Sequence, residues 1–181
     1  MTDQLEFARS IEGQFIKGLG PALTTEVKAK LRAAGLDLDG KILPAYPAAD
    51  VHRWIGVAAK AVYPSDVMEE GARKMAHLMI AGLEDSLIGR ALTAGLKLLG
   101  PRRSLDRVHR VFRNNGNYQE VTILEIGNDS ARVRVEYVFG LPTYYQGLFE
   151  GVLRLIDAKN PTVKITGTPG PGTILQVNWQ P

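Results

Sequence analysis

The spacing of apolar residues changes near residue 113, and this change constrains the fold more than any other feature. Before it, apolar residues recur every three or four positions, as on one face of an α-helix. After it, Arg132–Tyr137 alternates charged and apolar side chains, which is typical of a strand with one buried face. Between the two patterns, Gly100-Pro101 predicts a helix end and 113–118 predicts a turn. The chain should therefore have a helical first half and a strand-rich second half.

Capping residues divide the first half into successive helices. A capping box of Asp3 and Glu6 predicts a helix close to the N-terminus. Gly35 is a typical residue after a helix end, and Pro64 marks the end of another helix before it. The expected helix starts are Asp3, Thr24 or Thr25, Pro47, Ser65, Asp85 or Ser86, and Ser104. Together they predict a helical subregion over residues 1–112.

The second half, residues 113–181, predicts the order strand, strand, helix, strand, strand. The expected strands are 118–126, 132–137, 163–165 and 174–179, with turns at 127–130 and 169–172. A helix begins at Pro142, and Gly147 and Gly151 would let it approach its sheet closely. Hairpins at both ends favour a four-stranded antiparallel sheet with helices on one face. The chain is predicted to be one α+β domain, residues 1–181, with a helical N-terminal half packed on a ββαββ C-terminal half.

The composition is that of a globular protein without cysteine chemistry. Hydrophobic residues make up 45% of the 181 residues, which is enough for a sizeable core. The absence of cysteine excludes disulfides and thiolate metal sites. No apolar run in the sequence is long enough to cross a bilayer, and the first residues do not resemble a signal peptide. We therefore expect a cytoplasmic protein without membrane insertion.

One short segment holds much of the positive charge. The chain has a formal charge of +3, yet five arginines crowd into residues 102–113. Arg103, Arg107 and Arg110 follow the spacing i, i+4, i+7, which places them on one face of a helix. This face either binds an anion or an acidic partner, or is simply a solvated helix surface. Because no aromatic interleaving or known reader motif accompanies the arginines, we do not expect nucleic-acid binding.

No motif in the sequence predicts catalysis or a metal site. The stretch 35–42 resembles a phosphate-binding loop, but Ile42 stands where that loop needs a serine or threonine. His52, His77 and His109 fall on three different predicted helices, so the sequence contains no ready-made metal site. A nucleophile elbow is also missing from the sequence. We expect a non-enzymatic protein that has no cofactor and no metal.

Several short motifs resemble an uncharacterised paralogous family found in myxobacteria, whose members have nearly this length. The matching motifs are Pro44–Pro47, Gly89–Ala91, Gly100–Arg103, Phe112–Asn115, Asn117-Tyr118 and Val177–Trp179. They are spread over most of the chain. The resemblance implies many paralogues in one organism, which suits a regulatory or signalling module better than a housekeeping enzyme.

The order of elements is similar, more distantly, to that of the H-NOX haem domains and the related 4-vinyl-reductase-type ligand-binding domains. His109 falls where H-NOX domains have their haem-ligating histidine. The H-NOX motif Tyr-x-Ser-x-Arg, which holds the haem propionates, corresponds here to Tyr137–Leu141, and only the tyrosine is shared. Loss of the arginine removes a bidentate donor to a propionate. The resemblance therefore implies an H-NOX-like fold that binds no haem.

Two functions fit these predictions. In the first, the protein is a sensory or regulatory module whose cleft between the helical half and the sheet binds a small apolar or amphipathic ligand. The candidate lining residues of that cleft are Met75, Met79, His109, Tyr137 and Phe139. In the second, the chain's own side chains fill this region, and the protein acts through homodimerisation or through another protein partner.

Overall fold

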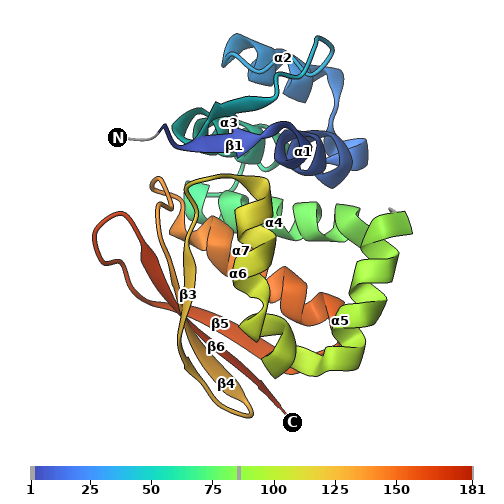
Figure 1. The fold of residues 1–181 in the computed structure, drawn as a ribbon. Helices are drawn as coiled ribbons and strands as arrows, with labels where there is room; N and C mark the ends of the chain where they lie inside the picture. The colour runs from blue at the N-terminus through green and yellow to red at the C-terminus, as the bar shows by residue number, and fades with distance from the viewer. Residues whose placement is uncertain (1–2, 85–86, 181) are drawn as a thin grey trace.

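The structure, a computed structural model, describes residues 3–84 and 87–180, so the helix start predicted at Asp85 or Ser86 lies outside the described residues. Figure 1 shows the N-terminal helices together at one end of the molecule and a four-stranded sheet with its covering helices at the other. Helix α4 (Met68–Glu84) lies between the two parts. This arrangement confirms the α+β class, with a helical first half packed on a sheet-containing second half.

The N-terminal part begins with a short strand and continues mainly as helices. Its elements are β1 (Leu5–Phe7), α1 (Ala8–Ile11), the π-helical segment η1 (Glu12–Gly18), the short 3-10 helix η2 (Gly20–Ala22), α2 (Thr25–Ala33), β2 (Ala45–Pro47) and α3 (Ala48–Val62). As predicted, α2 begins after Thr24, whose hydroxyl accepts a hydrogen bond from the backbone N–H of Val27. Gly35 follows the end of this helix with a left-handed φ of 98°, also as predicted.

The helix starts predicted at Asp3 and Ser65 are wrong. Asp3 and Glu6 do not form a capping box, because Glu6 lies in β1 and pairs with β2. In this pairing, the backbone N–H and C=O groups of β1 form hydrogen bonds with β2, whereas in a helix they would form hydrogen bonds within the same segment. Ser65 does not cap α4: the N–H of Asp66 bonds the carbonyl of Tyr63 in a turn, and the helix begins only at Met68.

The segment between the two halves contains two helices. Helix α5 (Leu87–Asp106) is interrupted at Gly100, whose φ of 72° and ψ of 172° leave the helical region, so its first stretch ends at the predicted place and a second stretch follows after the kink. Ser104 is not a helix cap, because it is buried and its hydroxyl donates to the carbonyl of Leu96 at 3.1 Å. Helix α6 (Val108–Asn115) begins after Arg107 instead.

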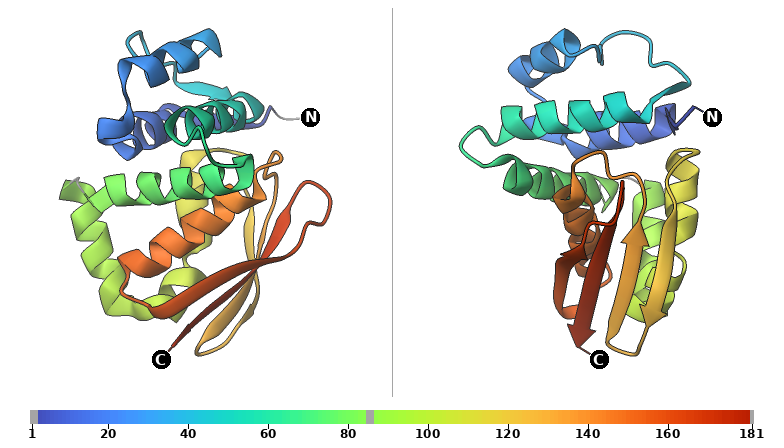
Figure 2. Two further views of the ribbon diagram at one scale, coloured as in Figure 1. Left: turned by 180° about the vertical axis from the view of Figure 1, so that it is seen from behind. Right: turned by 90° about the vertical axis from the view of Figure 1, so that its left-hand side faces the viewer.

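The C-terminal part is an antiparallel sheet with the strand order β3-β4-β6-β5. Its elements are β3 (Val121–Ile126), β4 (Ser130–Val135), α7 (Pro142–Leu155), β5 (Lys159–Gly167) and β6 (Thr173–Gln180). They confirm the predicted ββαββ order. Figure 2 shows the helices on one side of this sheet, as predicted. The other side of the sheet carries polar residues such as Arg132 and Arg134 on β4.

Helix α7 packs tightly against α4. A Cβ atom on Gly147 would lie 2.9 Å from the Cβ of Ala76, and one on Gly151 would lie 2.9 Å from the Cβ of Ile80. Both glycines therefore permit the two helices to approach closely. The sequence predicted that these glycines face the sheet, and this is wrong. Both glycines face the neighbouring helix α4.

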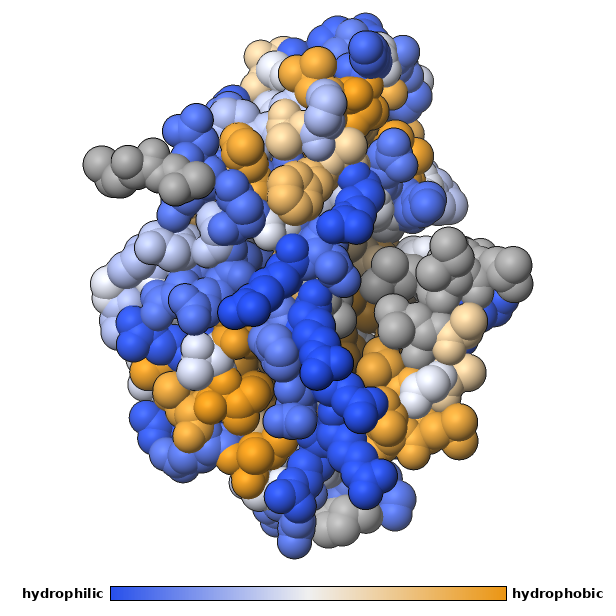
Figure 3. Space-filling view, in the orientation of Figure 1, coloured by the Kyte–Doolittle hydropathy of each residue, from blue (hydrophilic) through white to orange (hydrophobic). Residues whose placement is uncertain are grey.

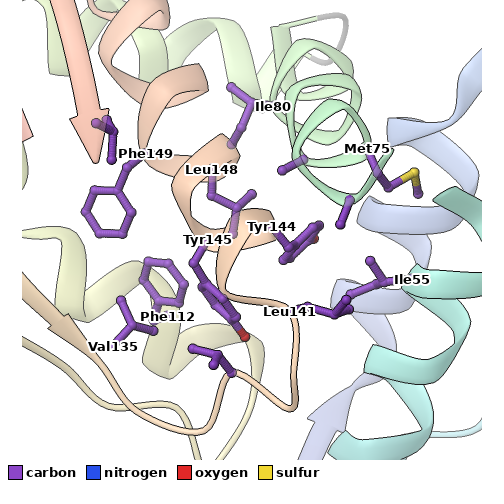
Figure 4. Close-up of a cluster of buried hydrophobic side chains, with 14 of the residues drawn as sticks. Ile55, Met75, Ile80, Phe112, Val135, Leu141, Tyr144, Tyr145, Leu148 and Phe149 are labelled. Atoms are coloured by element: carbon purple, nitrogen blue, oxygen red, sulfur yellow. The ribbon is translucent and has the colours of Figure 1, made fainter. Parts of the chain in front are cut away.

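The core runs from the helical half to the sheet. Figure 4 shows Tyr144 of α7 pointing towards Ile55 of α3, and Tyr145 pointing towards Phe112 of α6 and Val135 of β4. The ring of Tyr145 lies 6.3 Å from that of Phe112. Helix α7 thus joins the two halves through consecutive aromatic side chains.

Candidate functional site

A buried carboxylate lies where the N-terminal strand meets the segment that follows α6. One oxygen of Glu6 accepts hydrogen bonds from the hydroxyl of Ser10 at 2.5 Å and from the side-chain amide of Gln14 at 2.9 Å. The other oxygen accepts a 2.6 Å hydrogen bond from the phenol of Tyr118. Burial raises the pKa of Glu6, and the three donors oppose this rise. All of these partners come from the chain itself.

A neutral histidine lies beside this carboxylate. The Nδ1 of His52 donates to the carbonyl of Ala48 at 2.8 Å, so its Nε2 accepts a hydrogen bond from the phenol of Tyr145 at 2.7 Å. The side-chain amide of Gln119 donates to the same phenol oxygen. Burial lowers the pKa of His52 to about 4. Because both ring nitrogens are occupied, His52 offers no free position to a metal or a ligand.

Aromatic rings close the remaining space. The ring of Phe139 lies 4.6 Å from that of His52 and 5.7 Å from that of Tyr118. The phenol oxygen of Tyr144 lies 3.0 Å from the sulfur of Met79. We refer to Glu6, His52, Tyr118, Phe139, Tyr144 and Tyr145 as the junction cluster. These residues come from β1, α3, α7 and the segments on either side of β3 and β4, so the cluster ties the helical half to the sheet half.

The five predicted lining residues lie in different surroundings. Met75 is buried in the core. Phe139 belongs to the junction cluster and Met79 contacts its Tyr144, whereas Tyr137 is 38% exposed. His109 is half-buried on α6, and its imidazole makes no hydrogen bond or ring contact with any other described residue. The structure therefore brings Met79 and Phe139 to the cluster and leaves Tyr137 and His109 apart from it.

Hollows in the described part of the chain open at its surface. The largest of four has a volume of about 450 Å³ and lies between α4, α5 and α7, with His77, Lys97 and Arg154 among its lining residues. Another, of about 280 Å³, is lined in part by Tyr137 and Phe139. None of these four hollows is lined by Met75, Met79 or His109, the remaining predicted residues.

A second buried carboxylate joins α7 to α4. Glu150 accepts two hydrogen bonds from the guanidinium of Arg73, at 2.7 and 2.8 Å, and one from the imidazole of His77 at 2.9 Å. Burial alone would raise the pKa of Glu150, but the hydrogen bonds from His77 and Arg73 outweigh it and lower the pKa to about 2. This ion pair reinforces the contact that Gly147 and Gly151 permit.

The three arginines of the predicted anion face are all exposed. Arg103 lies in the last turn of α5, Arg107 immediately before α6, and Arg110 on α6. The opposite side of the segment is buried through Leu105 and Val108. The structure thus exposes all three arginines to solvent, but it places them on two helices with a break at Arg107, not on the single helix that their spacing predicted.

The described residues contain neither a metal-binding cluster nor a membrane-spanning helix. Among residues 3–84 and 87–180, no group of three or more histidine and acidic residues could hold a metal ion. No helix in the described part of the chain has both the length and the apolar character needed to cross a membrane.

Sequence reasoning missed the junction cluster. Glu6 between Leu5 and Phe7, and His52 next to Val51, are polar residues in apolar surroundings, a pattern that indicates a buried polar group. Their partners lie 112 and 93 positions away, and no local pattern identifies such partners.

Comparisons with known proteins agree with the fold. Residues 4–180 match the family described as "Protein of unknown function (DUF2378)". No curated protein matches the chain. An oxygen-binding H-NOX domain related to soluble guanylate cyclases, in its oxygen complex, is 12% identical with a TM-score of 0.70, over 96% of this chain and 95% of that chain.

Two further solved structures give similar values. A mutant of the T. tengcongensis H-NOX domain is 13% identical with a TM-score of 0.68, over 96% of this chain and 97% of that chain. A structure concerned with modulating haem redox potential through protein-induced porphyrin distortion is 14% identical with a TM-score of 0.68, over 95% and 94%. At such identities the likeness shows the fold alone.

Proposed function

Since this chain belongs to the DUF2378 family and has the fold of H-NOX domains, we propose that it is a haem-free regulatory module that acts through contact with another protein chain. In this proposal the module is non-enzymatic and cytoplasmic, and its partner is a second copy of the chain or a different protein. Many paralogues in one myxobacterial organism would suit such a role. This is the second of the two functions that fit the sequence.

The observation that carries the proposal is the filled junction between the two halves. The polar atoms of Glu6, His52 and Tyr145 are hydrogen-bonded to other groups of the chain. A ligand at this place would have to displace Phe139 from the ring of His52 and break buried hydrogen bonds. The interior therefore stabilises the fold, and the surface is left to carry the function.

The residues at the positions that the resemblance assigns to haem do not fit that group. Phe139 and Leu141 stand where the H-NOX motif has its serine and its propionate-binding arginine. Phe139 packs against the ring of His52, and Leu141 is buried in the core. Neither side chain can donate a hydrogen bond to a carboxylate. His109 is consequently a half-buried helix residue in this proposal, without a role towards a metal.

Native mass spectrometry of the purified protein tests the proposal, because one spectrum reports both the number of chains and any bound small molecule. We expect assemblies of whole chains that carry no small molecule. A monomer without a ligand would exclude the homodimer and leave a different protein as the partner. A stoichiometric small molecule that remains bound through purification would contradict the proposal.

A small amphipathic ligand is the second candidate function. It is supported by the hollow of about 450 Å³ between α4, α5 and α7, where the cationic groups of Lys97 and Arg154 lie next to apolar residues such as Ile80 and Leu155. Lys97 already pairs with Asp157 at 2.8 Å, so a ligand anion would compete with this carboxylate. The same mass spectra distinguish the two candidates.

A further inference from the structure

Four exposed arginines between the two halves pair with no carboxylate of the described chain. Arg103 lies in the last turn of α5, Arg107 precedes α6, and Arg110 and Arg113 lie on α6. All four are exposed, and none of their guanidinium groups forms an ion pair or a hydrogen bond with another described residue. We refer to these four residues as the arginine face.

Five arginines elsewhere in the described chain pair with a carboxylate, whereas Arg9 and Arg154 do not. These pairs are Arg32 with Asp37, Arg53 with Asp50, Arg73 with Glu150, Arg132 with Glu125, and Arg134 with Glu136. Residues 102–113, by contrast, contain five arginines and a single acidic residue, Asp106, so the formal charge of this segment exceeds the +3 of the whole chain. The concentration of unpaired charge is therefore local and is not a consequence of overall composition.

The arginine face is held in place from behind. Leu105 is 1% exposed, and Val108 and Phe112 on α6 are each 8% exposed, so the apolar side of the segment is anchored in the core. Figure 3 shows a strongly hydrophilic stripe that runs down the front of the molecule over α6 and the lower end of α5. The arginines thus project from a backbone that is already ordered, and binding costs little backbone entropy.

We infer that the arginine face binds an acidic segment, rich in aspartate and glutamate, of a partner protein. This inference rests on the proposed function and names the surface and the chemistry of the partner. Arg107 immediately precedes α6, and Arg110 and Arg113 follow on this helix at intervals of three residues, so an extended acidic segment laid along it could pair with them in turn. A guanidinium group presents a planar fork of donors that matches a carboxylate in two hydrogen bonds.

A nucleic acid is the less favoured partner for this surface. Single-stranded nucleic acids bind through base stacking on exposed aromatic rings as well as through charge. Phe112, the one phenylalanine, tyrosine or tryptophan in residues 102–113, is buried against the rings of Tyr145 and Phe149. The face therefore offers charge without stacking platforms.

Fluorescence anisotropy with the full chain and a fluorescein-labelled poly-glutamate peptide tests the inference. The test variant is the triple substitution Arg107→Gln, Arg110→Gln and Arg113→Gln. The matched control is Lys41→Gln, Lys60→Gln and Lys164→Gln, which removes the same charge from exposed residues on other parts of the chain. A single-stranded DNA with the same label provides the second probe, and thermal melting confirms that both variants fold.

We expect the wild-type protein to bind the peptide in a salt-sensitive manner and more tightly than the DNA. The test variant should bind about tenfold more weakly, because each exposed ion pair contributes only modestly. The control should bind within about twofold of wild type, because it lowers the net charge equally but leaves the arginine face intact. Equal losses in both variants, no peptide binding, or tighter binding to DNA would overturn the inference. The proposed function itself fails only if the wild-type protein takes up a haem or another small molecule.

Discussion

The phenol of Tyr118 donates a 2.6 Å hydrogen bond to the buried carboxylate of Glu6, although the two residues are 112 positions apart. The neighbouring residues are also hydrogen-bonded. The backbone N–H of Asn117 donates to the carbonyl of Leu5 at 3.1 Å, and the backbone N–H of Leu5 donates to the side-chain oxygen of Asn117 at 2.8 Å. The N-terminal strand is thereby fixed to the segment that follows α6. A fold that places a cofactor between these parts would need this contact to open.

Removing the phenol should destabilise the protein measurably. In Tyr118→Phe, the ring keeps its packing but Glu6 loses one of its three donors. We expect the free energy of unfolding to fall by about 1 to 3 kcal/mol, as for a buried hydrogen bond to a charged group. Urea unfolding measures this loss. Tyr137→Phe is the control, because Tyr137 is exposed, and an equal loss in both variants would show that Glu6 does not depend on Tyr118.

The stability of the protein should depend on pH through His52. Burial lowers the pKa of this histidine to about 4 in the folded state, against an ordinary value of 6.5. The unfolded chain therefore binds the proton first, so the stability that neutral His52 contributes is present above pH 6.5 and is lost as the pH falls from 6.5 towards 4. The full effect is about 3 kcal/mol.

Unfolding free energies of the wild-type protein and His52→Gln, measured from about pH 7 to about pH 5, isolate this contribution. The advantage of wild type over the variant should shrink as the pH falls. Glu6 acts in the opposite direction, because its raised pKa favours folding as the pH falls, but it is present in both proteins. A difference between the two proteins that stays constant over this range would refute the assignment.

The close approach of α7 to α4 should not tolerate a methyl group. In Gly147→Ala, the new Cβ would meet the backbone carbonyl oxygen of Arg73, which cannot move without shifting α4. We expect a loss of about 1 to 3 kcal/mol or more, as for overpacked cores. Gly95→Ala on α5, which meets no atom within 4 Å, should instead be neutral or stabilising by up to about 1 kcal/mol. Thermal melting of the two variants compares them, and similar melting temperatures would contradict the packing described here.

The sequence predicted those parts of the fold that depend on neighbouring residues. Thr24 caps its helix through a hydrogen bond to Val27, which is only three residues away. The alternating residues that follow Arg132 lie in β4, because successive side chains of a strand face opposite sides of the sheet. The false capping box at Asp3 and Glu6 shows where this reasoning ends. Its pattern is local, but pairing of β1 with β2 about 40 residues away prevailed.

The candidate site was less predictable for the same reason. Gly147 and Gly151 indicated a close contact, but their spacing does not say whether the neighbour is a sheet or a helix. The resemblance to H-NOX domains pointed to His109, whereas the histidine that lies in the junction cluster is His52. The hydrogen bond from Tyr145 to His52 depends on tertiary packing and has no counterpart in local spacing.

Titration of the purified protein with ferric and ferrous haem tests most directly the claim that the junction is filled by the chain itself. We predict no sharp, stoichiometric Soret band, and the same spectra for the wild-type protein and His109→Ala, because Phe139 and Leu141 provide no donor for a propionate. A stoichiometric complex that is lost in His109→Ala would contradict the account, since the junction would then have to open to admit the cofactor.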